Sequence, residues 1–110
     1  MALGAFGAHG LKARLPADML AVWHTAVQYH AWHALGLLAV GLGGAHYDNA
    51  WMRAAGWLLL AGIALFSGSL YALALGAPRT LGAVTPAGGL AFILGWLAFA
   101  VALIAARTPA

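Results

Sequence analysis

Three long stretches of the chain contain no Asp, Glu, Lys or Arg, and apolar residues dominate all three. They cover residues 19–47, 54–78 and 80–106, and every charged residue lies between or beyond them. An α-helix needs roughly 20 apolar residues to cross the hydrocarbon core of a bilayer. Each stretch is long enough to cross a membrane once and too short to cross it twice. The pattern therefore predicts three transmembrane helices.

Capping and turn residues set the expected ends of the first two helices. Pro16 favours a helix that begins directly after it, and a run of glycines suits its end, which predicts a helix over 17–44. Asn49 is a favourable N-cap because its side chain can accept a hydrogen bond from the first turn. Gly76 suits the C-terminal end of the same helix. The second helix is therefore expected over about 50–75.

The third helix and the N-terminus complete the expected fold. Thr85 followed by Pro86 is typical of a helix start, because a hydroxyl can cap the helix and proline loses no hydrogen bond there. This predicts a helix over 86–106. The apolar segment 1–11 would reach only about 16 Å as a helix, roughly half the hydrocarbon thickness. We expect an all-α transmembrane bundle of three full spans and a truncated N-terminal helix, with residues 1–110 forming a single membrane domain.

Composition supports a membrane protein and argues against several other classes. Only 6% of the 110 residues are charged and 65% are hydrophobic, whereas roughly 25% of residues are charged in an average soluble domain. The net charge of +3 comes from scattered cations without a basic stripe, so no nucleic acid partner is expected. There is no cysteine, which excludes disulfides and thiolate metal sites. Membrane lipids are the expected partners, and a homo-oligomer or other membrane proteins remain open.

The cations divide unevenly between the two sides that three crossings would create. Lys12, Arg14 and Arg79 lie on one side, whereas Arg53 and Arg107 lie on the other. Loops rich in Lys and Arg tend to stay in the cytoplasm. The count gives a small preference for a cytoplasmic first loop. We expect a multi-pass protein of the cell (inner) membrane.

A cluster of polar residues interrupts the first full helix. On a helical wheel of about 100° per residue, Tyr29 and His33 share one face. His24 and Gln28 share the opposite face, so these four side chains cannot all point at one neighbour. Tyr29 and His33 are spaced one turn apart and could form a local hydrogen-bonded pair. Polar side chains deep in a membrane usually face neighbouring helices and are paired there.

Further polar residues on other helices extend this cluster into a candidate centre. Ser67 and Ser69 lie in the second helix, and His9 ends the N-terminal segment. A zinc or iron site needs three or four ligands, or two axial histidines from facing helices in the case of haem. His9 and His33 are the only obvious cross-helix pair, and no cysteine or buried carboxylate supports them, so we predict no metal and no cofactor. A nucleophilic serine needs an oriented base, and no acid is placed to orient one, so we predict no catalytic residue and no enzyme. The candidate polar centre consists of His9, Tyr29, His33, Ser67 and Ser69.

Small residues recur along the helices. Gly7, Gly68, Gly88 and Gly89 are expected at close helix–helix contacts, because small residues let helix backbones approach one another in lipid. Spacings of four between small residues, such as Ala64 and Gly68, also suit self-association. We favour packing within one chain over homo-oligomerisation.

Four segments resemble a known family. They are GAFGAHG (4–10), TAVQYHAWHALGLL (25–38), FSGSLYAL (66–73) and VTPAGGLAFILGW (84–96). In this order they are similar to the YgdD-like small multi-pass membrane proteins, catalogued as domain of unknown function 423 and related to the eukaryotic transmembrane protein 256. The resemblance implies a four-helix fold whose first helix begins before GAFGAH, so that helix is expected to be cut short at Met1. It implies no activity.

Two functions remain open after these considerations. In the first, the chain is a structural or accessory membrane component whose polar groups hold the helices together. In the alternative, it is a small transporter or channel component that passes protons or a small solute through the His/Tyr/Ser centre. The sequence favours the first, because so few ionisable groups lie within the expected spans.

Overall fold

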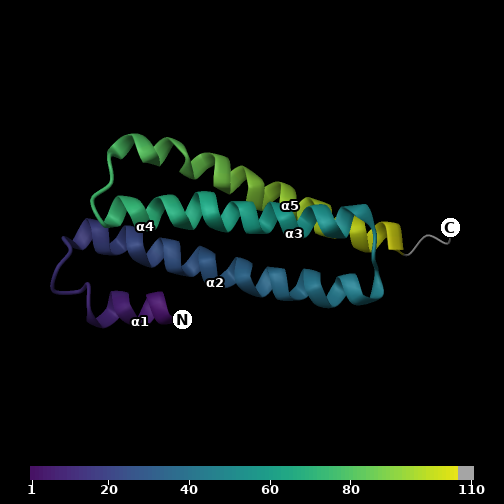
Figure 1. The fold of residues 1–110 in the computed structure, drawn as a ribbon, viewed down its shortest axis with the longest axis horizontal. Coiled ribbons are helices and arrows are strands. Elements are labelled where there is room, and N and C mark those ends of the chain that lie inside the picture. Colours follow the sequence, from purple (N-terminus) through teal and green to yellow (C-terminus); the bar gives the residue numbers. More distant parts are fainter. Residues whose placement is uncertain (107–110) are drawn as a thin grey trace.

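The helices follow one another along the chain as antiparallel neighbours (Figure 1). The structure, a computed structural model, describes residues 1–106, and Arg107 lies outside the described residues. Within them there is no strand, so the predicted all-α fold is confirmed. The elements are α1 (Ala2–His9), α2 (Ala17–His46), α3 (Ala50–Gly62), the π-helical turn η1 (Ile63–Ser67), α4 (Gly68–Ala74), the 3-10 helix η2 (Arg79–Ala83) and α5 (Thr85–Ala106).

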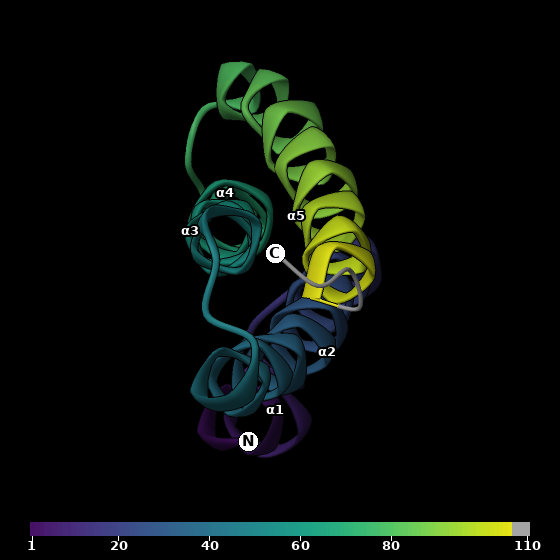
Figure 2. The ribbon, with the colours of Figure 1, turned by 90° about the vertical axis from the view of Figure 1, so that its right-hand side faces the viewer.

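The helices form a curved layer instead of a closed bundle. The Cα atoms extend 56 × 27 × 13 Å along the principal axes. α1 lies beside α2, α2 lies beside the continuous rod of α3, η1 and α4, and this rod packs along α5 (Figures 1 and 2). Across the curve, α2 and α5 also meet, because the Phe92 ring stacks on His33 and the Trp96 ring lies against Gly36. Each helix therefore keeps one or more faces uncovered.

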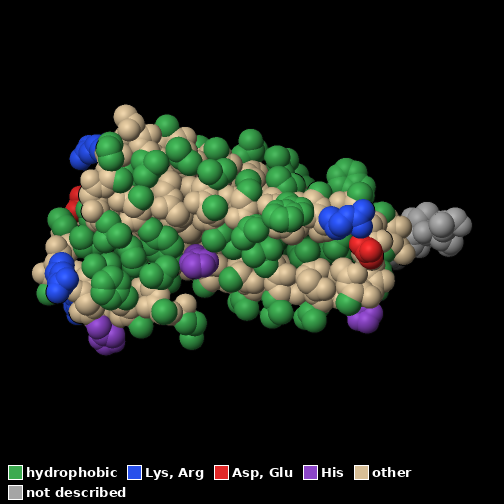
Figure 3. All heavy atoms as spheres, in the orientation of Figure 1, with side chains coloured by type: hydrophobic (Ala, Val, Ile, Leu, Met, Phe, Trp, Pro, Cys, Tyr) green, Lys and Arg blue, Asp and Glu red, His purple; other side chains and the backbone are tan. Residues whose placement is uncertain are grey.

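The uncovered faces are apolar. Trp57, Leu35 and Ile104 are 72%, 65% and 63% exposed, and hydrophobic side chains cover much of the face shown in Figure 3. The Lys, Arg and Asp side chains visible in that view gather at the two ends of the molecule. An apolar surface of this extent is unfavourable in water. It suits contact with lipid.

Length and hydropathy separate the three long helical rods. The segments Ala50–Ala74 and Arg79–Ala106 are long and apolar enough to cross a membrane. The 30 residues of α2 are also long enough, but α2 is not among the helices that meet the hydropathy requirement. Its polar residues, such as Gln28 and His30, lower its mean hydropathy. The crossing by α2 therefore stays a prediction.

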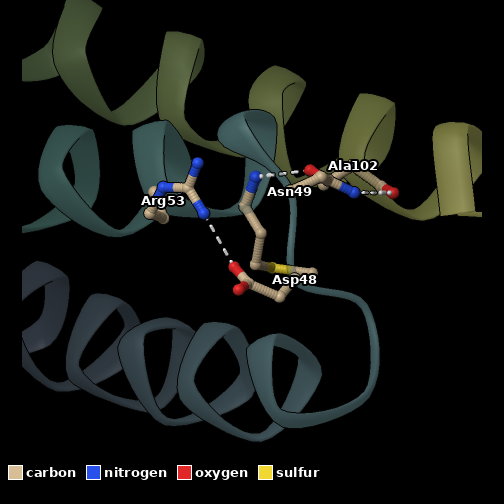
Figure 4. A network of polar contacts seen from close by, with 5 residues as sticks. Asp48, Asn49, Arg53 and Ala102 are labelled. Atoms are coloured by element: carbon tan, nitrogen blue, oxygen red, sulfur yellow. Dashed lines mark hydrogen bonds and ion pairs between the residues drawn. The ribbon is translucent and has the colours of Figure 1, made fainter.

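The predicted cap at Asn49 is confirmed, and the same side chain also joins α3 to α5. The Asn49 side chain accepts a hydrogen bond from the Met52 backbone N–H at 2.9 Å, which satisfies the first turn of α3. Its amide nitrogen donates to the Ala102 carbonyl at 3.1 Å and so ties the start of α3 to the end of α5 (Figure 4). Next to it, Arg53 and Asp48 form an exposed ion pair at 2.8 Å.

The predicted glycine at the end of α4 is also confirmed. Gly76 has φ +106°, a conformation that favours glycine. The Ala77 N–H donates to the Ala72 carbonyl and the Gly76 N–H donates to the Leu73 carbonyl. These two bonds form a Schellman motif, which ends the helix and turns the chain towards η2.

The predicted cap at Thr85 is wrong. α5 begins at Thr85 itself, directly after the short helix η2 and Val84. A capping hydroxyl at Thr85 would accept a hydrogen bond from the Gly88 N–H. That N–H instead donates to the Val84 carbonyl at 3.2 Å. The Thr85 hydroxyl instead lies 2.6 Å from the Ser69 hydroxyl on α4. The side chain therefore joins two helices instead of capping one.

The π-helical turn η1 and the short 3-10 helix η2 are elements that the pattern of the sequence did not predict. The π-helical turn bears directly on the packing. It interrupts the rod between α3 and α4, and its wider turn occurs where the rod meets both α2 and α5. Such turns are often found at functional sites. It lies beside Gly88 of α5, whose missing side chain leaves room for the Phe66 backbone.

Candidate functional site

The polar side chains of α2 divide between two faces, as the helical wheel predicts. His24 and Gln28 are exposed, whereas Tyr29 is half-buried and His33 is only 6% exposed. The exposed pair faces away from the other helices. Only the Tyr29 and His33 face can contribute to a site inside the layer.

His33 is held in one tautomer by its own helix. Its Nδ1 lies 2.7 Å from the Tyr29 backbone carbonyl. A carbonyl oxygen only accepts, so Nδ1 carries the proton and Nε2 of the neutral ring keeps its lone pair. The predicted pair with Tyr29 therefore exists, but through the backbone of Tyr29 and not its hydroxyl. The ring also stacks on Phe92 with centroids 3.5 Å apart, which joins α2 to α5.

Ser67 and Ser69 serve different helix contacts. Ser67 is completely buried, and its hydroxyl donates to the Ala26 carbonyl of α2 at 2.9 Å. The Ser69 hydroxyl lies 2.9 Å from the Phe66 carbonyl in its own rod and 2.6 Å from the Thr85 hydroxyl of α5. The two serines thus bind the central rod to its neighbours on both sides.

A fourth polar link was missed by reasoning from the sequence. His30 Nδ1 lies 3.0 Å from the Tyr71 hydroxyl, which joins α2 to α4. Trp23 packs edge-on against the same Tyr71 ring at 4.6 Å. Residues 30 and 71 are far apart along the chain, so no local spacing indicates their contact. The one related signal in the sequence is that His30 lies three residues before His33.

His9 does not join the candidate centre, so the prediction for it is wrong. α1 packs against the first part of α2, where Trp23 Nε1 donates to the Leu3 carbonyl at 2.9 Å. His9 lies beyond this contact, next to the loop at the end of the layer, and it is exposed. α1 runs antiparallel to α2, so its last residue lies beside the start of α2, and it is the first residues of α1 that approach His30. Among residues 1–106 no group of three metal-ligating side chains comes together.

The predicted packing glycines behave in two ways. A Cβ at Gly88 would clash with the Phe66 backbone, and one at Gly7 would clash with the Trp23 ring, so both mark close approaches. Gly68 approaches no other helix, and a Cβ at Gly89 would make only ordinary contact with Phe66 at 3.9 Å. These two are not required for packing. Glycines outside this set that also mark close approaches include Gly62, against Phe92, and Gly95, against Leu59.

Two hollows border these polar residues. The larger is an open groove of about 560 Å³ that lies between α2 and α5. The smaller, of about 250 Å³, adjoins α1 and reaches His30 and Tyr71. The residues that line the larger groove are Tyr29, His33, Phe66, Pro86, Gly89, Leu90, Phe92, Ile93 and Trp96.

Known proteins similar to this chain are membrane proteins without an assigned activity. The family model described as "Protein of unknown function (DUF423)" matches residues 3–89. The UPF0382 membrane protein YwdK of Bacillus subtilis is 52% identical over 103 residues, which cover 93% of this chain and 84% of the relative. The UPF0382 membrane protein SERP0230 of Staphylococcus epidermidis is 50% identical over 103 residues, with 92% and 82% covered.

A third relative, the UPF0382 membrane protein SSP2132 of Staphylococcus saprophyticus, is 53% identical over 96 residues, which cover 86% of this chain and 78% of the relative. No solved structure matches the chain. The relatives' names agree with the apolar outer surface and the two helices that can cross a bilayer. The resemblance stated from the sequence is confirmed: the chain is a membrane protein and belongs to the DUF423 family of proteins of unknown function.

Proposed function

We propose that this chain is a multi-pass protein of the cell membrane and acts there as a structural or accessory component. The observation that supports this role most directly is the way its deep polar side chains are used. Ser67 bonds to α2, Ser69 bonds to Thr85 at the start of α5, and Tyr71 bonds to His30. In lipid, polar groups of this kind hold helices together.

The same contacts weigh against the transport alternative. A route for protons or a small solute would need polar groups that connect across the layer. Ser67 and Ser69 bond to different helices, and His30 and His33 border separate hollows. The candidate centre is therefore divided into separate links. We likewise propose that the protein is not an enzyme, because among the described residues neither Ser67 nor Ser69 bonds to a histidine that could act as its base.

Replacing Ser67 by alanine tests the structural role. The variant loses the hydrogen bond between η1 and α2, so we expect the free energy of unfolding to fall by about 0.6–2 kcal/mol. Thr25→Ala is the matched control, because the Thr25 hydroxyl bonds only to the Ala21 carbonyl of its own helix. We expect that variant to change stability by less than about 0.5 kcal/mol. Reversible unfolding in mixed micelles measures both.

A flux assay distinguishes the proposal from transport. We expect liposomes that contain the wild-type protein to show no proton leak above that of empty liposomes. A leak that the wild type produces and that His33→Ala abolishes, while unfolding in micelles stays unchanged, would overturn the structural role. Equal loss of stability in the Ser67 and Thr25 variants would also contradict it.

A further inference from the structure

Beyond this structural role, we infer that the groove between α2 and α5 is a binding site for a neutral, lipid-soluble aromatic ring compound that carries a hydroxyl group. Phenols and hydroquinones are compounds of this class. The inference rests on one unpaired ring nitrogen of a nearly buried histidine, on the aromatic rings that line the same groove, and on the position of the groove between two apolar helices.

His33 provides a hydrogen-bond acceptor in the groove. The residue is buried, with only 6% of its surface exposed. Nδ1 is used as a donor to the Tyr29 carbonyl, so the remaining Nε2 can only accept. Within residues 1–106 no hydrogen bond is formed by Nε2, yet no fully buried side-chain polar atom lacks a partner there. Nε2 therefore stays accessible, and the hollow that His33 lines is this groove.

An apolar site with an acceptor selects a ligand that donates. A ligand that covers Nε2 without donating to it would leave a desolvated acceptor unmatched, at a cost of about 1–3 kcal/mol, whereas a ligand hydroxyl would give that acceptor a partner. The groove is lined by no Asp, Glu, Lys or Arg, so a charged ligand would lose its hydration without a counter-charge. The Tyr29 hydroxyl, which has no hydrogen bond among the described residues, offers a second polar atom along the same wall.

The walls of the groove suit a flat ring. Tyr29, Phe66, Phe92 and Trp96 all contribute aromatic side chains. The Tyr29 ring is nearly parallel to the His33 ring, at an interplanar angle of 7° and a centroid distance of 6.0 Å. Aromatic pairs prefer stacked or edge-on contacts, and a planar ligand can make both here. An acyl chain would fill the space without using these geometries.

Size and access also fit a small lipid-soluble compound. The volume of about 560 Å³ lies within the range of about 300–1,000 Å³ typical of small-molecule pockets. Leu90 and Ile93 on its rim are 56% and 59% exposed on the apolar outer face. A ligand dissolved in the bilayer can therefore enter sideways from the lipid.

The test uses the full chain in lipid nanodiscs and three probes. These are a hydroquinone with a short alkyl tail, its dimethyl ether, and a saturated fatty alcohol of matched hydrophobicity. We expect saturable binding of the hydroquinone by calorimetry. The ether, which cannot donate to Nε2, should bind about 10-fold more weakly, the factor that corresponds to 1.4 kcal/mol. The alcohol, which lacks the ring, should also bind more weakly.

Three variants assign the site. His33→Phe keeps a ring against Phe92 but removes the acceptor, so the 10-fold preference for hydroquinone over ether should disappear; His30→Phe, in the other hollow, should keep it. Gly89→Leu fills the groove at a position with free space and should abolish binding of both ring probes. Absence of saturable hydroquinone binding, equal affinity for the ether, or a preference that survives His33→Phe would each overturn the inference. So would a fatty alcohol that binds as tightly as the hydroquinone.

Discussion

Replacing Gly88 by alanine is expected to lower the free energy of unfolding by about 3 kcal/mol, at the upper end of the cost of overpacking. A Cβ at this position would lie 2.7 Å from the Phe66 Cα and closer still to the Phe66 backbone nitrogen. Backbone atoms of the π-helical turn cannot rotate away as a side chain can. α5 would have to move from the central rod, which would also stretch the bond between Ser69 and Thr85.

The neighbouring Gly89 provides a control in the same helix turn. A Cβ there would meet only the Phe66 ring edge at 3.9 Å. Gly89→Ala should therefore leave stability unchanged or raise it by up to about 1 kcal/mol, because alanine favours helix more than glycine does. Unfolding of both variants in mixed micelles gives the comparison. Similar losses for Gly88→Ala and Gly89→Ala would mean that the two backbones are not in contact.

Replacing Trp23 by alanine is expected to cost about 3–5 kcal/mol. Trp23 is only 3% exposed and belongs to the small core that holds α1 to α2. Its ring contacts Phe6 and Tyr71, and its Nε1–H donates to the Leu3 carbonyl. In lipid this loss is one of packing and hydrogen bonding, because burial from water does not drive helix contact there. α1 should become separable from α2.

Trp57 is the matched control, since it is the same residue type but is 72% exposed on the outer face. Trp57→Ala should change stability by less than about 0.5 kcal/mol. Limited proteolysis of detergent-solubilised protein gives a second measurement, because α1 should be cut first only in the Trp23 variant. If both substitutions destabilise the protein equally, Trp23 does not hold α1 in the described position.

The helices and their ends could be predicted because local chemistry determines them. Charge-free runs marked the long helices, Asn49 caps the start of α3, and Gly76 ends α4, as their side-chain and backbone preferences require. Helical periodicity correctly placed His33 and His24 on opposite faces of α2, of which the His33 face is the buried one. Thr85 shows the limit of this reasoning. A hydroxyl at a helix start can cap its own helix or bond to a neighbouring helix. The Thr85 hydroxyl bonds to Ser69 of α4.

The arrangement between helices could not be predicted, because it depends on register. Residues 26 and 67 meet only once α2 and the central rod are aligned, and nothing local fixes that alignment. The prediction that His9 joins the candidate polar centre was wrong for the same reason, since the position of α1 along α2 is set by Gly7 and Trp23. The π-helical turn depends on the space that Gly88 leaves on another helix. Such features need the packed structure.

Cysteine labelling in intact cells tests the central claim, that α2, the central rod and α5 cross the membrane as one layer. The chain has no native cysteine, so Ala13→Cys, Ala50→Cys and Thr80→Cys each introduce a single exposed thiol near one end of a rod. A membrane-impermeant maleimide should label position 50 and spare positions 13 and 80 until the cells are permeabilised. Positions 13 and 50 reacting alike would show that α2 does not cross the membrane and would contradict the account.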